Sequence, residues 1–553
     1  MTLAGRPWLS SYPDGVPHTL SYPEVPVYAL LDEAAQRHGA AAATHFYGAR
    51  LTWAHVRHQA DAFAAALASL GVQKGDRVAI MLPNIPQTVI AYFGALKAGA
   101  VVAFCNPLYT ERELAHQLND SGAGVIVALD RLAPRIRAVQ GGTSIRRLIL
   151  TGLTDYMPLA LRVMAPFVKP DLVGKVPREP DVYAFRELIR RHDGAEPPAV
   201  AIDPVRDLAL LQYTGGTTGL SKGAMLTHRN LVANVWQLRA WMQTAEEGSE
   251  RILAVMPFFH VYGLTVCLNM AALLAAMLLL VPRFDVKQVL KLVHRERPTL
   301  FPGAPTMYVA INQYPGISRY RLDSIRACIS GAAPLPVEVQ TTFEALTGGT
   351  LVEGYGLTEA SPVTHCNPLA GRRVPGSIGL PLPDTEVKIV DLETRAEELP
   401  PGEVGELCIR GPQVMAGYWN RPEETDQVLR DGWLHTGDVA WMDEAGYTYL
   451  VDRIKDVIIA GGYNIYPREV EEVLYEHPAV LEAAVVGVPD EYRGQSVKAF
   501  VVPKPGEVVT ADEIIGFCRE RLAKYKVPRE VEFRPELPKS LAGKVLRREL
   551  RGE

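Results

Sequence analysis

The sequence predicts an α/β protein with a large N-terminal domain and a small α+β C-terminal domain. Strand-like and helix-like segments alternate over roughly the first 375 residues. Short strands with Gly and Asp turns follow Gly376, and a new strand and helix pattern begins after Asp452. A chain of 553 residues is also too long for one hydrophobic core, so at least two domains are expected.

The N-terminal region is expected to form two doubly wound sheets. The run "RVAIMLP" is typical of a strand, "QTVIAYFGALKAG" of a helix, and "AVVAFCNP" of a second strand. The next helix, "TERELAHQLNDSGA", has a capping box of Thr110 and Glu113. Strands separated by helices indicate parallel sheets covered on both faces, with subdomains at about 1–200 and 201–375.

The remaining segments predict two further parts. "TEVKIVD" and "GELCIRG" indicate a small antiparallel barrel or sheet over residues 376–451. "DVIIAGGYNIYPREVEEVLYEHP" is typical of a strand, a turn and a helix, and Thr510 with Glu513 caps a later helix. We therefore expect a large domain at 1–451 and a compact α+β domain at 452–553.

Composition and charge exclude several classes of protein. The net charge of −5 gives no basic field for nucleic acid, so no nucleic-acid partner is expected. The six cysteines are scattered without a C-x-x-C pair, which favours reduced, buried thiols over disulfides or a zinc site. "MTLAGRPWLSSYPDG" contains no apolar core of a signal peptide, and we expect a cytoplasmic protein.

Two apolar segments raise the question of membrane contact. The uncharged run from Val261 to Val281 is long enough to span a bilayer, but a buried helix followed by a buried strand is favoured. The stretch from Tyr156 to Arg186 is expected to be an irregular excursion. It mixes Arg and Lys with large apolar residues, so peripheral contact with the inner face of the cell membrane and ordinary packing both stay open.

A glycine-rich stretch, "YTGGTTGLSKG", follows an apolar strand and indicates an anion-binding loop. Its lysine does not directly follow the last glycine of a Walker A pattern, so a P-loop NTPase is not predicted. Glycines let backbone N–H groups approach an anion, and hydroxyls and an amine add donors. A flexible surface turn is the alternative. The donor groups are those of Thr214, Gly215, Gly216, Thr217, Thr218, Gly219, Ser221 and Lys222.

Five motifs resemble those of the adenylate-forming (ANL) superfamily, which includes acyl-CoA synthetases, adenylation domains and luciferases. They are the glycine-rich stretch, "GYGLTEASP", "GWLHTGD", "DRIKDVIIAGGYNIYPREVE" and "LPKSLAGKVLRREL", and the likeness covers nearly the whole chain. Within the superfamily, "NPLYTERELAHQLNDSGA" and "GPQVMAGYWNRPE" resemble bacterial long-chain fatty-acyl-CoA synthetases. The resemblance implies ATP, Mg²⁺ and coenzyme A, with a fatty acid joined first to AMP and then to the thiol.

The resemblance also assigns catalytic roles. Lys544 is implied to bridge the acyl carboxylate and the α-phosphate, with Lys539 as a lesser candidate; from composition alone, Lys544 is one more solvated lysine. Glu359 is implied to hold Mg²⁺ with Thr214, against an alternative role as an acid at a helix N-terminus. His260 is implied to line the acyl carboxylate, although a histidine among aromatic residues is commonly a packed core residue.

The nucleotide is implied to lie against small residues, an aromatic ring and an acidic ribose contact. "SGAAP" offers a flat surface, and "EGYG" offers a ring for stacking. Asp438 is a suitable acceptor for ribose hydroxyls, with Arg453 as a second contact. The "HTGD" motif also fits a tight turn, and the two interpretations are compatible. The implied contacts are Gly331, Ala332, Ala333, Glu353, Gly354, Tyr355, Gly356, Thr358, Asp438 and Arg453.

A hinge at Asp452–Arg453 is implied between the two half-reactions. The small domain is then mobile, and it presents either Lys544 or the face of Gly461, Gly462 and Tyr463, which would bind coenzyme A. The alternative for Gly461 and Gly462 is that they only end a strand and bind no ligand. Some related long-chain enzymes carry a gate tryptophan after the equivalent histidine. Here "VYGLTV" has Leu264 instead, so the existence of such a gate stays open.

Several alternatives stay open at this point. A medium-chain synthetase would use the same motifs. A fatty-acyl-AMP ligase would pass the acyl group to a carrier protein, but such ligases often carry an insertion that is not evident here. A fatty-acid binding or uptake protein without chemistry would not need Lys544, Glu359 or the glycine-rich stretch. Chain-length preference and pathway are not determined by the sequence, and a homodimer is left open.

Overall fold

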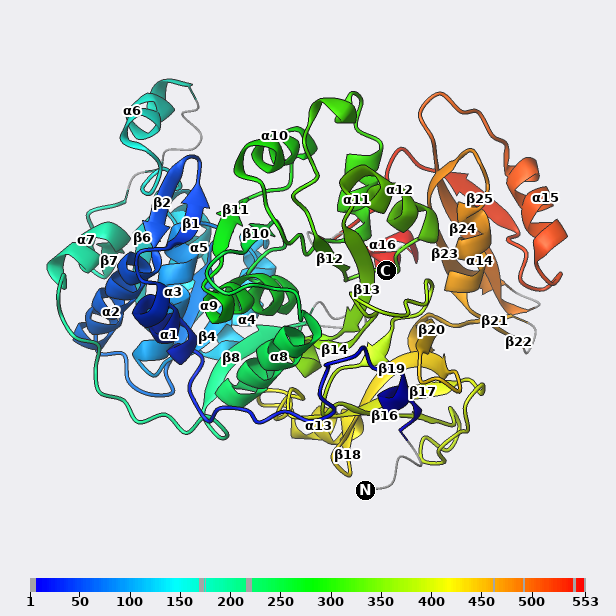
Figure 1. Ribbon diagram of the computed structural model, residues 1–553, viewed down its shortest axis with the longest axis horizontal. Coiled ribbons are helices and arrows are strands. Elements are labelled where there is room, and N and C mark those ends of the chain that lie inside the picture. Colours follow the sequence, from blue (N-terminus) through cyan, green and yellow to red (C-terminus); the bar gives the residue numbers. More distant parts are fainter. Residues whose placement is uncertain are drawn as a thin grey trace. The chain divides into compact units, whose positions relative to one another are not determined.

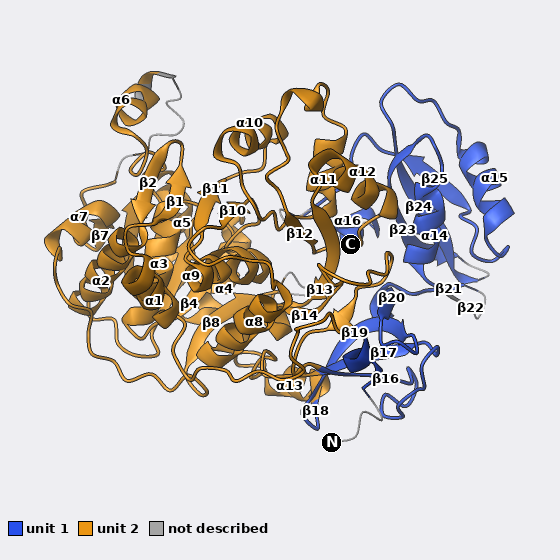
Figure 2. Cartoon of the chain, viewed as in Figure 1, with its two compact units in different colours: residues 1–11, 386–409, 430–553 blue, residues 12–385, 410–429 orange. Residues whose placement is uncertain are grey.

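The computed structural model describes residues 6–168, 174, 176–214, 221–460, 463–490, 493–540 and 544–551. The chain forms two compact units (Figure 2). Unit 1 comprises residues 1–11, 386–409 and 430–553, and unit 2 comprises residues 12–385 and 410–429. The expected α/β class is confirmed. The expected division into domains at residue 452, and the mobility of the smaller domain, stay predictions.

The first sheet of unit 2 has seven strands in the order β7-β6-β5-β3-β4-β8-β9 (Figure 1). Neighbours are parallel from β7 to β8, and β9 pairs antiparallel with β8. The strands are nearly continuous apolar runs because helices bury both faces. Their bounds are β3 Arg77–Met81, β4 Val101–Phe104, β5 Val125–Leu129, β6 Arg147–Thr151, β7 Val182–Ala184, β8 Leu208–Tyr213 and β9 Gly223–Thr227.

Two helices of this sheet, α3 and α4, lie where the sequence predicts. All twelve residues of α3 are buried, which explains why its pattern is apolar on every side. The capping box of α4 is confirmed, since Glu113 N donates to Thr110 Oγ1 at 3.3 Å and Thr110 N donates to Glu113 Oε2 at 2.8 Å. The bounds are α2 Trp53–Ser69, α3 Pro86–Lys97, α4 Glu111–Ser121, α5 Ala133–Gln140 and α7 Phe185–Arg191.

The second sheet of unit 2 is built from two four-stranded parts, β10-β11-β1-β2 and β12-β13-β14-β15. Bridges through Leu300 connect β10 to β12. The pairs β1–β11, β10–β11 and β12–β13 are parallel. The bounds are β1 Ala42–Phe46, β2 Ala49–Thr52, β10 Arg251–Ala254, β11 Met277–Leu280, β12 Ala327–Ser330, β13 Thr350–Gly356, β14 Val363–Cys366 and β15 Leu380–Pro381.

The uncharged run from Val261 to Val281 is a buried helix and strand, as favoured from the sequence. A π-helical turn at Gly263–Asn269 leads into α9, Met270–Leu274, and then into β11. Among the residues described, every helix is too short or too polar to cross a lipid bilayer. The other helices of unit 2 are α1 Ala29–His38, α8 His228–Trp241, α10 Val286–Glu296, α11 Pro305–Asn312, α12 Val337–Thr347 and α13 Pro422–Val428.

The expectation of an irregular stretch from Tyr156 to Arg186 is wrong for residues 182–186, which form β7 and the start of α7, and for ten earlier residues. These ten residues form helix α6, Leu159–Val168, which projects at one end of unit 2 (Figure 1). Its residues include Leu, Ala, Arg and Met, which favour helices, and Arg162 N donates to Pro158 O at 3.0 Å. Periodicity was not visible because several large apolar side chains of α6 are exposed, among them Val163 at 60% and Phe167 at 85%.

Unit 1 contains two further sheets. The first confirms the expected β-rich part, with β17 and β20 pairing antiparallel with β19. Its strands are β16 Glu386–Val390, β17 Gly405–Arg410, β18 Leu429–Arg430, β19 Trp433–Met442 and β20 Thr448–Arg453.

The second sheet of unit 1 has the order β22-β21-β24-β23, with β25 on β24. Its core contains Ile458, Ile465, Val485 and Val501. The capping box of Thr510 and Glu513 is confirmed. The bounds are β21 Ile458–Ala460, β22 Tyr463–Ile465, α14 Pro467–Tyr475, β23 Val480–Asp490, β24 Gly494–Pro503, α15 Ala511–Arg521, β25 Glu530–Phe533 and α16 Arg547–Arg551.

Candidate active site

The glycine-rich stretch connects β8 to β9 at the carboxyl end of β8. Tyr213 pairs with Gly223 across the two strands, and Thr214 N donates to Lys222 O at 2.9 Å, so the ends of the connection are held together. Ligands of open α/β sheets bind at the carboxyl ends of parallel strands, which is where this connection begins. The predicted contacts Gly215, Gly216, Thr217, Thr218 and Gly219 lie outside the described residues.

Lys222 and Glu359, predicted for phosphate and metal, meet at one tyrosine. The amine of Lys222 lies 5.1 Å from the ring centroid of Tyr418. The hydroxyl of Tyr418 donates to Glu359 Oε1 at 2.6 Å. Lys222 also forms an ion pair with Glu424 of α13. Tyr418 therefore connects Lys222 to Glu359, and Glu424 is a further partner of Lys222. Neither Tyr418 nor Glu424 was predicted from the sequence.

The backbone of residues 415–419 lies along β9, which explains how Tyr418 reaches this place. Met225 N donates to Gly417 O at 2.8 Å, and Trp419 N donates to Gly223 O at 2.8 Å. Met415 N donates to Glu359 O at 2.8 Å, which ties the same segment to the turn at Thr358–Ala360. Tyr418 belongs to the segment "GPQVMAGYWNRPE", whose resemblance to fatty-acyl-CoA synthetases was the only signal for it in the sequence.

Glu359 and Thr214 have the chemistry that Mg²⁺ requires. Mg²⁺ prefers carboxylate and other hard oxygen ligands and keeps several waters, so it needs side chains that solvent and phosphate can reach. Both residues are half-buried, and the carboxylate of Glu359 is oriented by the hydroxyl of Tyr418. These donors fit the metal that the resemblance implies.

The predicted adenine contacts lie together on two neighbouring strands. Ser330, the last residue of β12, pairs with Glu353 of the parallel strand β13. The 331–333 segment therefore follows the end of β12, next to Gly354 and Tyr355 of β13. A Cβ atom on Gly354 would lie 2.8 Å from the side chain of Ile329, so only glycine fits there.

Tyr355 and Thr358 complete this edge of unit 2. The ring of Tyr355 is half-buried and lies edge-on to His365, with ring centroids 5.8 Å apart. A Cβ atom on Gly356 would lie 2.0 Å from Pro362 O, so the chain passes close to itself before the turn that carries Thr358 and Glu359. The motif "EGYGLTE" thus places both a ring for stacking and an acidic group at the same strand end.

His260 is half-buried, so it is not a fully packed core residue. Its Nδ1 accepts a hydrogen bond from Tyr262 N at 3.3 Å. The preceding Phe259 O accepts from Gln212 Nε2 of β8 at 2.8 Å. The turn that carries His260 is therefore fixed to the strand that leads into the glycine-rich stretch.

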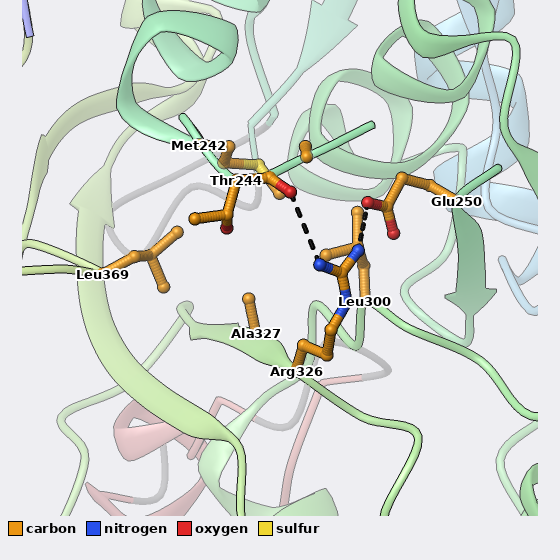
Figure 3. A pocket seen from close by; sticks show the side chains of 8 residues that line it. Met242, Thr244, Glu250, Leu300, Arg326, Ala327 and Leu369 are labelled. Atoms are coloured by element: carbon orange, nitrogen blue, oxygen red, sulfur yellow. Dashed lines mark hydrogen bonds and ion pairs between the residues drawn. The ribbon is translucent and has the colours of Figure 1, made fainter. Parts of the chain in front are cut away.

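A small cavity lies elsewhere in unit 2, at the opposite end of β12 (Figure 3). Ala327, the first residue of β12, lines it, whereas Gly331 follows the last residue. Arg326 crosses the cavity and pairs with the fully buried Glu250. None of the predicted site residues lines this cavity, and its ion pair is internally satisfied.

In unit 1, the structure brings together Asp438 and Arg453, the two residues predicted to contact the ribose. They are directly opposite on β19 and β20, and Arg453 Nε lies 3.1 Å from Asp438 Oδ1. Asp452 is buried, and its carboxylate accepts from Arg453 N at 2.7 Å and Arg468 N at 2.8 Å. Burial raises the pKa of Asp452.

Lys544 lies in a tight backbone turn. Its N donates to Ser540 Oγ at 3.2 Å, and Ser540 N donates to Lys544 O at 2.8 Å. Burial, followed by the positive charge of Arg453, lowers the pKa of Lys544 to about 7. Lys539, the lesser candidate, is paired with Glu482. Lys544 is therefore no ordinary solvated lysine.

The predicted contacts for coenzyme A are only partly described. Gly461 and Gly462 lie outside the described residues. The backbone of Tyr463 begins β22 and pairs with Ala460. Their role in thiol transfer stays a prediction.

The fold is that of an α/β protein in which the glycine-rich stretch and the 331–333 segment follow the carboxyl ends of parallel strands. Residues 31–419 match the family model of AMP-binding enzymes, and residues 469–544 match the model of the AMP-binding enzyme C-terminal domain. The chain belongs to this family of AMP-binding enzymes.

Two relatives of similar length carry the name long-chain-fatty-acid–CoA ligase. A long-chain-fatty-acid–CoA ligase of Bacillus subtilis (strain 168) is 49% identical over 546 residues, covering 99% of this chain and 97% of the relative. One of Salmonella typhimurium is 43% identical over 555 residues, covering 99% and 98%. The crystal structure of ATP-bound MatB from Rhodopseudomonas palustris matches with a TM-score of 0.82 and 31% identity, covering 96% of this chain and 99% of that chain.

The lowered pKa of Lys544 gives a direct prediction. An amine reacts with an acylating reagent only when neutral, and a pKa of about 7 makes Lys544 neutral above that pH. Labelling of Lys544 in the nucleotide-free protein, followed by peptide mass spectrometry, should rise through pH 7. Labelling that rises only near pH ~10, as for ordinary lysines, would contradict the lowered pKa.

Proposed function

We propose that this chain is an AMP-forming long-chain-fatty-acid–CoA ligase. It converts a fatty acid and ATP to an acyl-adenylate and pyrophosphate, and then transfers the acyl group to the thiol of coenzyme A with release of AMP. The observation that carries the proposal is the 49% identity to a ligase of this name over 99% of the chain. The contacts of Tyr418 with both Lys222 and Glu359 support the proposal.

The first step joins two anions. A carboxylate oxygen attacks the α-phosphorus, the bond to the bridging oxygen breaks, and pyrophosphate leaves with that electron pair. Negative charge increases on the α-phosphate oxygens, so positioned cations lower the barrier. Lys544 supplies one such cation. A phosphate anion beside its amine raises its pKa again, which favours the charged form when it is needed.

The remaining nucleotide contacts are assigned to the predicted residues. The stretch from Thr214 to Lys222 holds the β- and γ-phosphates, Tyr355 and the 331–333 segment hold adenine, and Asp438 with Arg453 holds the ribose. Glu359 and Thr214 would hold Mg²⁺, which would neutralise charge on the phosphates.

The second step needs no covalent acyl-enzyme. The thiol sulfur of coenzyme A attacks the acyl carbon, its proton is lost, and AMP leaves with the electron pair of the broken acyl–oxygen bond. All six cysteines of the chain are buried, and burial raises the pKa of Cys105 to about 12. Buried, neutral thiols are poor nucleophiles, which supports direct transfer.

We assign Asp452–Arg453 as the hinge at which the small domain changes its pose between the two steps. The carboxylate of Asp452 accepts a hydrogen bond from Arg468 N, at the start of α14, and its Oδ1 lies 3.5 Å from Arg547 Nη1. Asp452 therefore contacts residues near the beginning and near the end of the small domain. In one pose the domain presents Lys544, and in the other it presents residues 461–463 to the thiol arm.

The acyl chain is assigned to the apolar region beside His260. Leu264, Val266 and Leu268 of the π-helical turn are buried and apolar, which suits a long alkyl chain better than a polar acid.

A series of acids from acetate to long-chain fatty acids tests this function. With ATP, Mg²⁺ and coenzyme A present, AMP formation should be greatest with long-chain acids, because each buried CH₂ contributes about 0.8 kcal/mol. A preference for short or aromatic acids would refute the long-chain assignment. Medium-chain acids would identify a medium-chain synthetase. AMP formation only with a holo-carrier protein would identify an acyl-AMP ligase.

We also infer peripheral contact with the inner face of the membrane through α6. Leu159, Val163, Met164 and Phe167 expose 74%, 60%, 54% and 85% of their surfaces, and Arg162 lies among them. A short helix with exposed large apolar residues and a basic residue suits an anionic bilayer surface. A cytoplasmic location suits this arrangement, and a homodimer stays a prediction.

Vesicle co-sedimentation tests the role of α6. The double variant Val163→Glu and Phe167→Glu should reduce sedimentation with phosphatidylglycerol vesicles and leave acyl-CoA formation with dispersed fatty acid intact. The matched control is Val508→Glu, which changes a residue that is 92% exposed in unit 1. Equal sedimentation of the α6 variant and the unchanged protein would contradict the inference.

A further inference from the structure

Tyr418 makes contact with both charged groups that the proposed function assigns to MgATP. Its ring faces the amine of Lys222, and its hydroxyl donates to Glu359. The hydroxyl is the donor in this pair, because a carboxylate oxygen accepts hydrogen bonds. One neutral side chain thus contacts the cation on one side and the carboxylate on the other.

The position of Tyr418 is fixed by its neighbours. Tyr418 N donates to Thr425 Oγ1 at 2.9 Å. Trp419 Nε1 donates to Asp120 O at 3.1 Å, and the carboxylate of Asp120 accepts from Tyr213 Oη at 2.8 Å. The segment is therefore braced against α4 and against the last residue of β8. A hydroxyl held in this way can orient the carboxylate to which it donates.

Glu424 is placed to compete with phosphate for Lys222. It forms ion pairs with Lys222 and with Arg421, whose Nε lies 3.5 Å from Glu424 Oε1. Arg421 is in turn paired with Asp120 at 3.1 Å. Glu424 therefore keeps a cationic partner when Lys222 leaves. The side chains of Lys222 and Glu424 are each 33% exposed, and ion pairs of this kind are weak.

We propose that Tyr418 and Glu424 form a clasp that prepares the site for MgATP. Tyr418 is a positioning residue that orients Glu359 toward the metal. Glu424 is a counter-ion that holds Lys222 until the phosphates of ATP replace it. This inference rests on the proposed function, because it takes the phosphate and metal roles of Lys222 and Glu359 from it.

Equilibrium binding of ATP tests the clasp without catalysis. Calorimetry on the full-length protein would measure the Kd for ATP over a series of Mg²⁺ concentrations, with no fatty acid present. Glu424→Gln should tighten ATP binding about two- to fivefold, because a weak competing ion pair is removed. Tyr418→Phe should raise the Mg²⁺ concentration needed for half-maximal tightening about fivefold, because one hydrogen bond to the carboxylate is lost.

Two matched controls isolate these effects. Glu423→Gln removes the same charge from the neighbouring, exposed position of α13. Tyr22→Phe removes another tyrosine hydroxyl that donates to a carboxylate, that of Asp384 at 2.7 Å. Both controls should bind ATP and respond to Mg²⁺ as the unchanged protein does. Thermal unfolding of each variant would identify a loss of fold, and Glu424→Gln keeps the test available if Tyr418→Phe does not fold.

The outcomes separate the clasp from the proposed function. The clasp would be overturned if Glu424→Gln bound ATP no more tightly than the unchanged protein, or if Tyr418→Phe needed no more Mg²⁺. Acyl-CoA formation by the unchanged protein would still support the proposed function in that case. An unchanged protein that formed no AMP with any acid would instead refute the function, whatever the binding data showed.

Discussion

The repulsion between a carboxylate and a triphosphate is the constraint on which this structure depends. Neither anion approaches the other unless cations offset the charge, and such cations act strongly only where water is partly excluded. The predicted cations are divided between the two units, with Lys222 in unit 2 and Lys544 and Arg453 in unit 1. The proposed adenylation therefore uses groups that are distant in the sequence.

Some charged side chains are fully paired within the protein, whereas others are held by weaker contacts. Glu406 accepts two hydrogen bonds from Arg395, at 2.8 and 2.7 Å, and lies 2.9 Å from His435. Although these groups and Cys408 resemble a set of metal ligands, the bidentate arginine already balances the carboxylate. Burial raises the pKa of Cys408 to about 12, which keeps its thiol neutral. By contrast, Lys222 and Glu359 are half-buried and held by contacts that a ligand can replace.

The sequence predicted the elements whose signals are local. Apolar runs located β3, β4 and β5, and the side chains of Thr110 and Thr510 marked helix starts, because a capping box involves residues only three positions apart. Helix α6 was missed because its apolar residues face solvent. The sites were named by resemblance, and pairs such as Asp438 and Arg453 became evident only through strand register. Tyr418 was missed because its partner Glu359 lies 59 residues away.

The exchange of labelled pyrophosphate into ATP tests the central claim most directly, because it reports the first step alone. In the Lys544→Ala protein, exchange dependent on fatty acid should be lost, while transfer from a supplied acyl-adenylate to coenzyme A should persist. The Lys539→Ala protein provides the matched control and should retain exchange. Exchange at an unchanged rate in Lys544→Ala would contradict the account, since no amine at that position would then be needed to join an acid to AMP.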